Sequence, residues 1–256
     1  MPFTLSHPAA ILPIRRLKPL RTVPLVLGAM APDFSHYLPW SVRTWFPDTH
    51  NLAASWRVCV PLCLAIIGGC YLLRAPLTAL MSPRARWLFM TAIGPFGRRP
   101  VEWLLAPFSI LIGAWSHLLW DSFTHGNGWM VRHYAPLHAT FAVGAYEITV
   151  NRVLQYLSSV AGLAVLTVWY WRLPVPDPLP LQARSGRPRA GPVLLLCAAA
   201  ATLIGAVQAT GSLEHALSVY GALETFFTHG LAWFAAMYMV AGAVLTLEHG
   251  GDTTVR

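Results

Sequence analysis

Charged residues are scarce in this sequence. Asp, Glu, Lys and Arg make up 11% of the 256 residues and hydrophobic residues 55%, whereas about a quarter of an ordinary soluble domain is charged. This scarcity excludes a typical water-soluble domain. Five apolar runs each approach the ~20 residues with which a helix crosses the hydrocarbon core; they lie at 58–73, 103–120, 154–171, 192–209 and 229–247. We therefore expect an all-α fold, a polytopic membrane helix bundle of five to six transmembrane helices with a short N-terminal helix.

Several common functional signals are also missing. The sequence has no phosphate-binding glycine loop, no dinucleotide fingerprint and no Gly-x-Ser-x-Gly elbow, so nucleotide-driven and serine-based chemistry have no support. The basic residues of the N-terminus follow a short, proline-broken apolar run, which fits a cleaved signal peptide poorly, and we expect Met1 onward to belong to the mature chain. All four cysteines lie in apolar runs, which indicates neither a disulfide framework nor a thiolate metal site: Cys59, Cys63, Cys70 and Cys197.

Positive charge is concentrated at the ends of the apolar runs. The net charge is +8, which in a soluble protein would make nucleic acid a candidate partner. Here the arginines flank the runs, so membrane lipid, not nucleic acid or nucleotide, is the expected partner. Two groups mark loops that the positive-inside rule assigns to the cytoplasm: Arg74, Arg84, Arg86, Arg98 and Arg99, and Arg172, Arg184, Arg187 and Arg189.

The path of residues 23–39 decides the number of spans. This segment is short and is broken by Pro32 and Asp33. If it crosses the membrane, there are six spans and 14 of the 18 Lys and Arg residues lie inside. If it lies in the interface, there are five spans and the split is 10 to 8. Charge favours six spans, and a half-buried re-entrant segment is the alternative. In either topology 121–153 lies on the external side.

Ligand-type side chains form a stripe near the end of the second apolar run. In AWSHLLWDSFTHGNGW, His117, Asp121 and His125 are spaced i, i+4 and i+8, which places them on one face of a continuous helix. Ionisable groups near membrane depth are costly unless they are paired, hydrated or bound to metal. The stripe therefore predicts a metal site, and a hydrogen-bonded network that ties helices together is the alternative.

Further candidate ligands lie in the first fifty residues. Asp33 follows a proline at the end of an apolar run and shares one helical turn with His36, and His50 lies on the same side of the membrane as Asp121 in either topology. His7 fits less simply. Either residues 1–39 are re-entrant and His7 belongs to the site, or His7 only starts a short helix predicted over 8–17.

The chain resembles a known bacterial family in several segments. MPFTLSHPAAILPIRRL, APDFSHYL, SHLLWDSFTHGNGWMVRH and LQYLSSVAGL, with the His50 stretch, are similar to the membrane proteins of domain of unknown function 4184, strongly over 1–171. The chain is also distantly similar to predicted membrane-bound metal-dependent hydrolases, and its His-x-x-x-Asp element to zinc-dependent phospholipase C. The resemblance implies a site carried by His117 and Asp121, with His7, Asp33, His50 and His125 as companions. At His50 the family usually has Ser-His-Thr, where this chain has Asp48-Thr49-His50-Asn51.

These observations predict a metal-dependent hydrolase of lipid-like esters or phosphoesters, in the bacterial inner membrane with its site on the periplasmic side. Zinc is the expected ion because imidazole and carboxylate ligands suit it. His117, Asp121, His125 and Asp33 would hold one metal, or two if His7 and His50 join, and Asp33 or Asp121 would be the catalytic proton acceptor. The alternatives are a transporter and a non-catalytic membrane protein with a structural polar cluster. We expect a metal-site core over 1–173, a Pro/Arg-rich linker over 174–191 and a C-terminal helix pair over 192–256.

Overall fold

The fold is helical and can cross a membrane several times. The computed structural model describes residues 4–37, 47–143, 146–180, 189–214 and 219–248. The predicted all-α membrane fold is confirmed, with five spans, and each predicted apolar run falls on one of them. Within the described residues five helices are long and apolar enough to span a bilayer: Leu52–Leu72, Pro100–His133, Val150–Arg172, Ala190–Thr210 and Thr225–Glu248.

The chain divides into two compact units. Unit 1 comprises Met1–Phe34, Pro47–Ile67 and Arg99–Leu173, and unit 2 comprises Ser35–Phe46, Gly68–Arg98 and Pro174–Arg256. The elements of unit 1 are η1 (Thr4–Ser6), α1 (Pro8–Ile11), α2 (Thr22–Met30), the start of η2 (Ala31–Tyr37), α4 (Leu52–Ala54), η3 (Ser55–Cys59), most of α5 (Val60–Leu72), α8 (Pro100–Thr124), α9 (Trp129–His133), α10 (Ala135–His138), β1 (Thr140–Val143), β2 (Tyr146–Thr149) and α11 (Val150–Arg172). The division expected from the sequence stays a prediction, and residues 181–188 of its linker lie outside the described residues.

Unit 2 contains a long helical pair. Its elements are the end of α5, α6 (Arg74–Ala79), α7 (Pro83–Ile93), η4 (Gly94–Gly97), α13 (Ala190–Glu214) and α14 (Val219–Glu248). Helix α14 packs on α13 and α6. Ala79, Leu80 and Leu245 form a small buried cluster, and the Tyr238 hydroxyl donates to the Leu77 carbonyl at 2.6 Å. These contacts join α14 to α6.

Helix α8 carries the predicted ligand stripe. It begins with Pro100 at a position where a missing backbone N–H costs nothing. It ends at Thr124, and the chain then folds back over the last helical carbonyl groups. A Cβ on Gly128 would lie 2.5 Å from the Ser122 carbonyl oxygen, so only glycine fits this turn. His125 is therefore the first residue beyond the helix, and its backbone N–H still donates to the Asp121 carbonyl at 3.0 Å.

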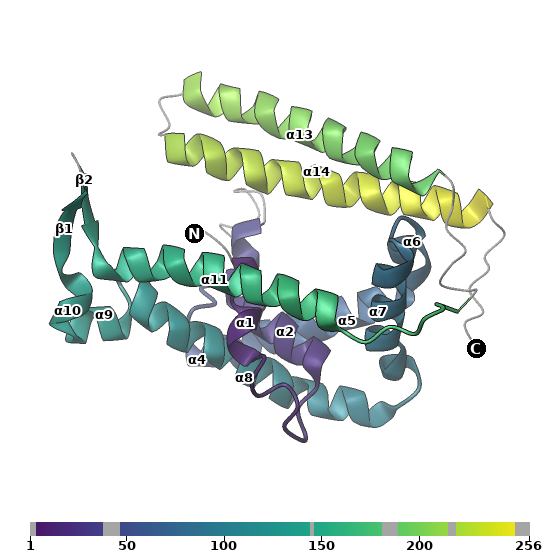
Figure 1. Ribbon diagram of the computed structural model, residues 1–256, viewed down its shortest axis with the longest axis horizontal. Coiled ribbons are helices and arrows are strands. Elements are labelled where there is room, and N and C mark those ends of the chain that lie inside the picture. The colour runs from purple at the N-terminus through teal and green to yellow at the C-terminus, as the bar shows by residue number, and fades with distance from the viewer. Residues whose placement is uncertain (1–3, 38–46, 144–145, 181–188, 215–218, 249–256) are drawn as a thin grey trace. The chain divides into compact units, whose positions relative to one another are not determined.

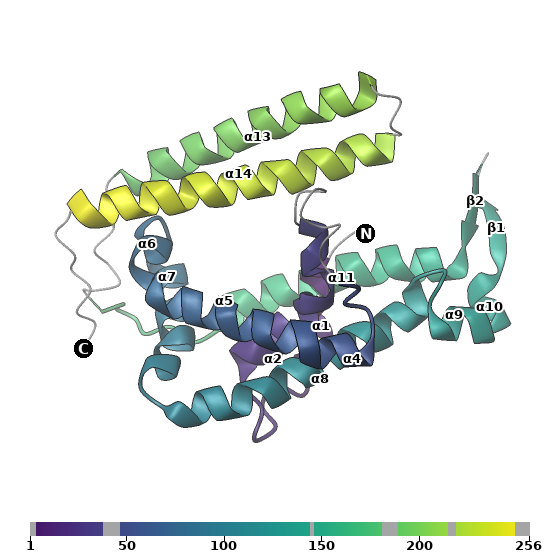
Figure 2. The same cartoon turned by 180° about the vertical axis from the view of Figure 1, so that it is seen from behind.

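Residues 4–34 form a helical hairpin against α8 and α11 (Figures 1 and 2). The first arm, η1 and α1, packs on α11, and the second arm contains α2, which packs on α8. Helix α2 runs in the same direction as α8. At its start the Arg21 N–H donates to Ser109 Oγ at 2.9 Å, and at its end the Ala29 carbonyl oxygen lies 2.9 Å from His117 Nδ1. The end of α2 therefore lies beside the ligand stripe.

Two glycines allow α2 and α8 to touch. A Cβ on Gly28 would lie 2.2 Å from the Ile110 carbonyl oxygen, and a Cβ on Gly113 would lie 2.3 Å from the Leu25 carbonyl oxygen. Small residues let helix backbones approach closely in membrane bundles. The close approach brings the Ala29 carbonyl within reach of His117.

The hairpin corresponds to the re-entrant alternative for the N-terminal segment. The helix predicted over 8–17 is only Pro8–Ile11, followed by turns. Helices α2 and η2 together cover 22–37, fewer than the ~20 residues of a span, and 38–39 lie outside the described residues. The sixth span that the charge distribution favoured is not found among the described helices. The basic residues on which it rested lie instead at the turn between α1 and α2: Arg15, Arg16, Lys18 and Arg21.

A short β-hairpin was not predicted. Strands β1 and β2 pair antiparallel, with Thr140 opposite Thr149 and Val143 opposite Tyr146. The hairpin lies between α10 and α11 in the sequence, in the segment expected to be an external loop.

Candidate metal centre

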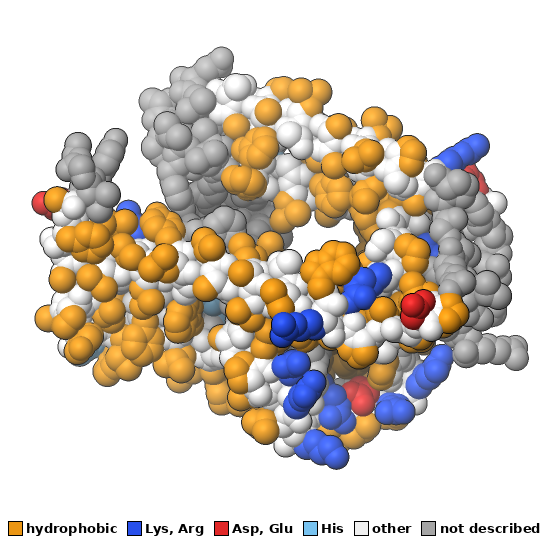
Figure 3. Space-filling view, viewed as in Figure 1, with side chains coloured by type: hydrophobic (Ala, Val, Ile, Leu, Met, Phe, Trp, Pro, Cys, Tyr) orange, Lys and Arg blue, Asp and Glu red, His pale blue; other side chains and the backbone are white. Residues whose placement is uncertain are grey.

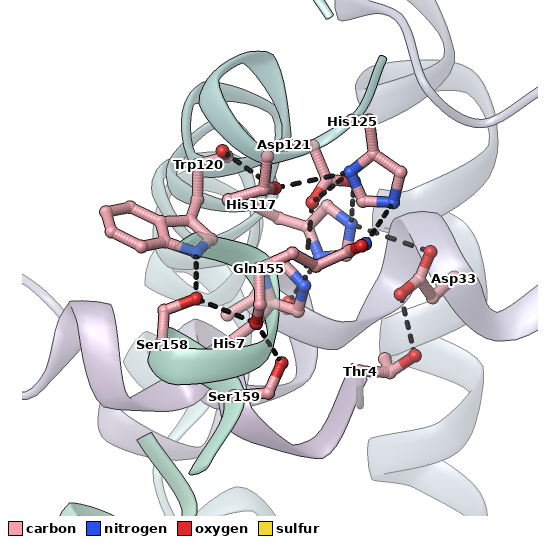
Figure 4. Close-up of polar contacts among 12 residues, drawn as sticks. Thr4, His7, Asp33, His117, Trp120, Asp121, His125, Gln155, Ser158 and Ser159 are labelled. Atoms are coloured by element: carbon pink, nitrogen blue, oxygen red, sulfur yellow. Dashed lines mark hydrogen bonds and ion pairs between the residues drawn. The ribbon is translucent and has the colours of Figure 1, made fainter. Parts of the chain in front are cut away.

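Four ligand-type side chains from three separate segments meet inside unit 1. Asp33 comes from η2, His50 from the residues before α4, and His117 and Asp121 from α8. Each offers one ligand atom, and these atoms all lie within 4.8 Å of one another. We call these four residues the metal cluster. Figure 4 shows Asp33, His117 and Asp121 with their polar contacts.

His117 is the fully buried centre of the metal cluster, with an exposed fraction of 0%. Its Nδ1 donates to the Ala29 carbonyl at 2.9 Å, because a carbonyl can only accept. In the neutral ring Nε2 then carries a lone pair. This Nε2 lies 3.1 Å from Asp121 Oδ2 and 3.6 Å from Asp33 Oδ1, yet no hydrogen bond of acceptable geometry reaches it. In this neutral form, a buried lone pair faces two carboxylates.

Asp33 is held in place by residues on both sides of it. The Thr4 hydroxyl donates to Asp33 Oδ2 at 2.6 Å, and His50 Nε2 lies 3.1 Å from Asp33 Oδ1. His50 is positioned by its neighbours in turn. The buried Thr49 hydroxyl donates to the Pro32 carbonyl, and the Asn51 side chain caps α4 by accepting from the Ala54 N–H at 2.8 Å. These contacts bring the 49–51 segment to the end of the N-terminal hairpin.

Asp121 has two differently surrounded oxygens. Oδ2 faces His117, while Oδ1 lies 3.6 Å from His7 Nε2 and 3.3 Å from His125 Nδ1. The His7 ring also stacks on His117 with a centroid distance of 3.8 Å. The Gln155 amide nitrogen lies 3.1 Å from His125 Nε2 and donates to it, so His125 Nδ1 carries the proton, which it donates to Thr124 Oγ1 at 3.3 Å. His7 and His125 therefore flank the metal cluster through Asp121.

A small pocket is lined in part by Asp121 and Asp33. Its volume is about 20 Å³, which is room for about one water-sized occupant. Four elements of unit 1 contribute to it, and its described lining contains no Lys or Arg. The lining residues are Thr4, Ser6, His7, Asp33, Trp120, Asp121, Thr124, His125, Gln155, Ser158 and Ser159.

The metal cluster fits a divalent metal ion. Two imidazoles and two carboxylates, without a thiolate, suit zinc and other first-row ions. A cation is needed among these groups because a His117 lone pair and two acidic side chains converge in a buried place. A proton on His117 Nε2 is the alternative cation; it would form ion pairs with Asp121 at 3.1 Å and with Asp33 at 3.6 Å, without a well-directed hydrogen bond to either. The buried Asp/His group could therefore hold a metal.

The structure brings all six predicted ligand residues together. Asp33, His50, His117 and Asp121 form the metal cluster, and His7 and His125 lie beside it. His50, at which the sequence departs from the family pattern, is one of the four. Sequence reasoning missed the anchoring hydroxyls of Thr4 and Thr49, because a lone threonine in a loop or before a helix carries no spacing signal.

Comparison with known proteins places the chain in a family without an assigned activity. The family model described as Domain of unknown function (DUF4184) matches residues 1–247. No curated protein and no solved structure matches the chain.

Proposed function

The chain belongs to the family of this domain of unknown function, DUF4184, and we propose that it is a membrane-embedded, metal-dependent hydrolase of lipid-like esters or phosphoesters. The observation that carries the proposal is the buried His117 Nε2, which faces Asp33 and Asp121 without a hydrogen bond of its own. Buried unpaired polar atoms are rare and mark sites that need an ion or water. Polar ligand groups at membrane depth are also costly to retain for packing alone.

We propose one zinc ion held by the metal cluster. Such an ion lowers the pKa of bound water to about 7 and stabilises the negative charge that develops on the attacked group. Nδ1 of His117 is tied to the Ala29 carbonyl, and a second bond of this kind orients a ligating ring and raises its basicity. Thr4 orients Asp33 in the same way.

Asp121 is the better candidate for the catalytic proton acceptor. Both oxygens of Asp33 have hydrogen-bonding neighbours, Thr4 at Oδ2 and His50 at Oδ1. Asp121 Oδ1 instead has no hydrogen bond of acceptable geometry. A general base must lie within hydrogen-bond reach of the proton that it removes. Asp121 and Asp33 both line the pocket, so the uncommitted Oδ1 is what favours Asp121 as the acceptor.

The position of the cluster along α8 supports an external site, and its place in a membrane helix supports a lipid-like substrate. His117 and Asp121 lie near the C-terminal end of this helix, whereas Arg99 and the basic turn with Arg16 and Lys18 lie near its N-terminal end. Figure 3 shows Lys and Arg gathered around that turn and hydrophobic side chains along α11. With the turn in the cytoplasm, 14 of the 18 Lys and Arg residues obey the positive-inside rule with only five spans. The cluster then faces the periplasmic side.

Hydrolysis of lipids by purified protein tests the proposal. Zinc-loaded protein in lipid nanodiscs should release the head group or acyl chain of at least one phospholipid or diacylglycerol class. Asp121→Asn should abolish turnover because it removes the proton acceptor and one ligand. The matched control is Asp177→Asn, outside the metal cluster in the loop after α11, which should leave turnover unchanged. Full turnover in Asp121→Asn, or none by zinc-loaded parent protein on any ester, would refute a hydrolase.

A further inference from the structure

The pocket beside the metal cluster is closed by a side-chain contact between α8 and α11. The Trp120 indole N–H donates to Ser158 Oγ at 3.3 Å, and both residues line the pocket (Figure 4). Trp120 is also 36% exposed, which makes it the most exposed of the described lining residues. A side chain that lines a pocket and also reaches the molecular surface separates the pocket from its surroundings. The Trp120 ring is therefore an outer wall of the pocket.

The pocket must open before an ester can reach it. Its volume is about 20 Å³, which is room for about one water molecule. That water is the one that the proposed hydrolysis uses, and even a small ester group with its neighbouring carbons is several times larger. The contact of Trp120 with Ser158 is the easiest to open, because an exposed hydrogen bond contributes only about 1 kcal/mol.

The two helices on either side of this contact are held together elsewhere. The buried Asn151 side chain of α11 donates to the Thr124 carbonyl, at the end of α8, at 3.0 Å. Farther along α11, a Cβ on Gly162 would lie 3.0 Å from the Ser6 Cβ, so α11 packs tightly on η1. Separation of the helices would break these contacts, whereas rotation of the Trp120 side chain leaves them intact. Exposed side chains change rotamer on the picosecond to nanosecond timescale.

The opened pocket would face the bilayer. Leu119 and Leu157 are the sequence neighbours of Trp120 and Ser158, and they are 60% and 66% exposed, as expected of side chains that contact lipid. Trp120 lies near the C-terminal end of α8, and tryptophan is enriched where the hydrocarbon core meets the head groups. The ester and phosphoester groups of a bilayer lipid lie at this same level, between head groups and hydrocarbon.

We propose that Trp120 is a gate, and that the ester group of a bilayer lipid enters the pocket laterally, between α8 and α11, when the Trp120–Ser158 bond breaks. This inference rests on the proposed function for the identity of the reacting group. It makes Trp120 a residue that determines specificity, because the gate opens towards lipid and admits a substrate that never leaves the bilayer.

Histidine labelling tests the gate without turnover. His7 lines the pocket with a side chain that is only 10% exposed, so its modification by diethyl pyrocarbonate in nanodiscs, followed by mass spectrometry, reports opening. Trp120→Ala should speed this reaction at least about tenfold, and Ser158→Ala, which removes a bond of ~1 kcal/mol, up to fivefold. Trp115→Ala is the matched control, because Trp115 is exposed on the same helix but does not line the pocket. The exposed His133 should react equally in every variant. A rate at His7 that stays at the parent value in Trp120→Ala or Ser158→Ala overturns the gate.

Photo-crosslinking tests the lateral route. Phosphatidylglycerol with a diazirine on its acyl chain beside the ester would be incorporated into the nanodisc, and a short water-soluble diazirine ester would be added to a parallel sample. The lipid probe should attach to the peptide that contains the buried Ser159, more in Trp120→Ala than in the parent, and the soluble probe should attach far less. Attachment of the soluble probe alone, or of neither probe, in Trp120→Ala overturns lateral entry.

Failure of the gate and failure of the proposed function give different results. Lateral entry in both experiments, without turnover of any lipid by the zinc-loaded protein, contradicts the hydrolase and leaves the gate standing. Turnover of lipid with unchanged labelling of His7 in Trp120→Ala contradicts the gate and leaves the hydrolase standing.

Discussion

Substitution of Gly28 by alanine should damage the metal cluster without touching any of its ligands. The new Cβ would lie 2.2 Å from the Ile110 carbonyl oxygen, and ordinary contact begins at 3.4 Å, so α2 and α8 must separate by about 1 Å. The His117 Nδ1 to Ala29 carbonyl distance of 2.9 Å would then exceed hydrogen-bonding range. Overpacking of this kind costs roughly 1–3 kcal/mol, and the lost hydrogen bond about 1 kcal/mol more.

Thermal unfolding and metal affinity in detergent are the assays for Gly28→Ala. A loss of roughly 2–4 kcal/mol corresponds to a fall in the unfolding midpoint of about 5–15 °C for a chain of this size. Zinc affinity, measured by competition with a chelator, should fall about 10- to 100-fold, as when the outer partner of a ligating histidine is lost. Gly69→Ala is the control, because a Cβ there meets nothing within 4 Å. If Gly28→Ala matched Gly69→Ala in both assays, the contact between α2 and α8 would not be what orients His117.

Three further predictions concern the same cluster. Thr4→Val removes the donor to Asp33 Oδ2 and should lower zinc affinity about tenfold, as measured by chelator competition. An unchanged affinity would mean that Thr4 does not orient Asp33. His7→Phe keeps a ring to stack on His117 and should retain one zinc per chain by elemental analysis while turnover falls; loss of zinc would make His7 a ligand. Removal of zinc by a chelator should lower the unfolding midpoint by about 10 °C, because a ligand at about a thousand times its dissociation constant adds ~4 kcal/mol; an unchanged midpoint would mean that the folded chain binds no zinc.

The long helices were predictable because their signal is local. A run such as 103–120 is apolar over its full length, and the length of a membrane span follows from bilayer thickness. The ends were less predictable. Helix α8 continues to Thr124 and stops only where Gly128 closes over its last carbonyls, a contact between residues that no periodicity encodes.

The gathering of the ligands was predictable only in part. His117 and Asp121 share a helix face by spacing alone. The approach of Asp33 and His7 depends on the hairpin of residues 4–34, which is too short and too broken for hydropathy to place. The contact of Gly28 with Ile110 and of Gly113 with Leu25 fixes that hairpin, and a sequence shows glycines without showing which helix they meet. Charge counting favoured a sixth span because it cannot distinguish two cases. A true span and a re-entrant hairpin both place the basic residues between α1 and α2 on the cytoplasmic side.

Metal analysis of the purified chain tests the central claim, which is that one ion is bound by Asp33, His50, His117 and Asp121 together. Protein purified in detergent with zinc in the medium, and then dialysed against metal-free buffer, would be measured by elemental analysis beside the His117→Ala and His133→Ala variants; His133 lies on α9 outside the metal cluster. We expect about one zinc per chain in the parent and in His133→Ala, and almost none in His117→Ala. A parent chain without stoichiometric metal, or a His117→Ala variant that keeps all of it, would contradict the account.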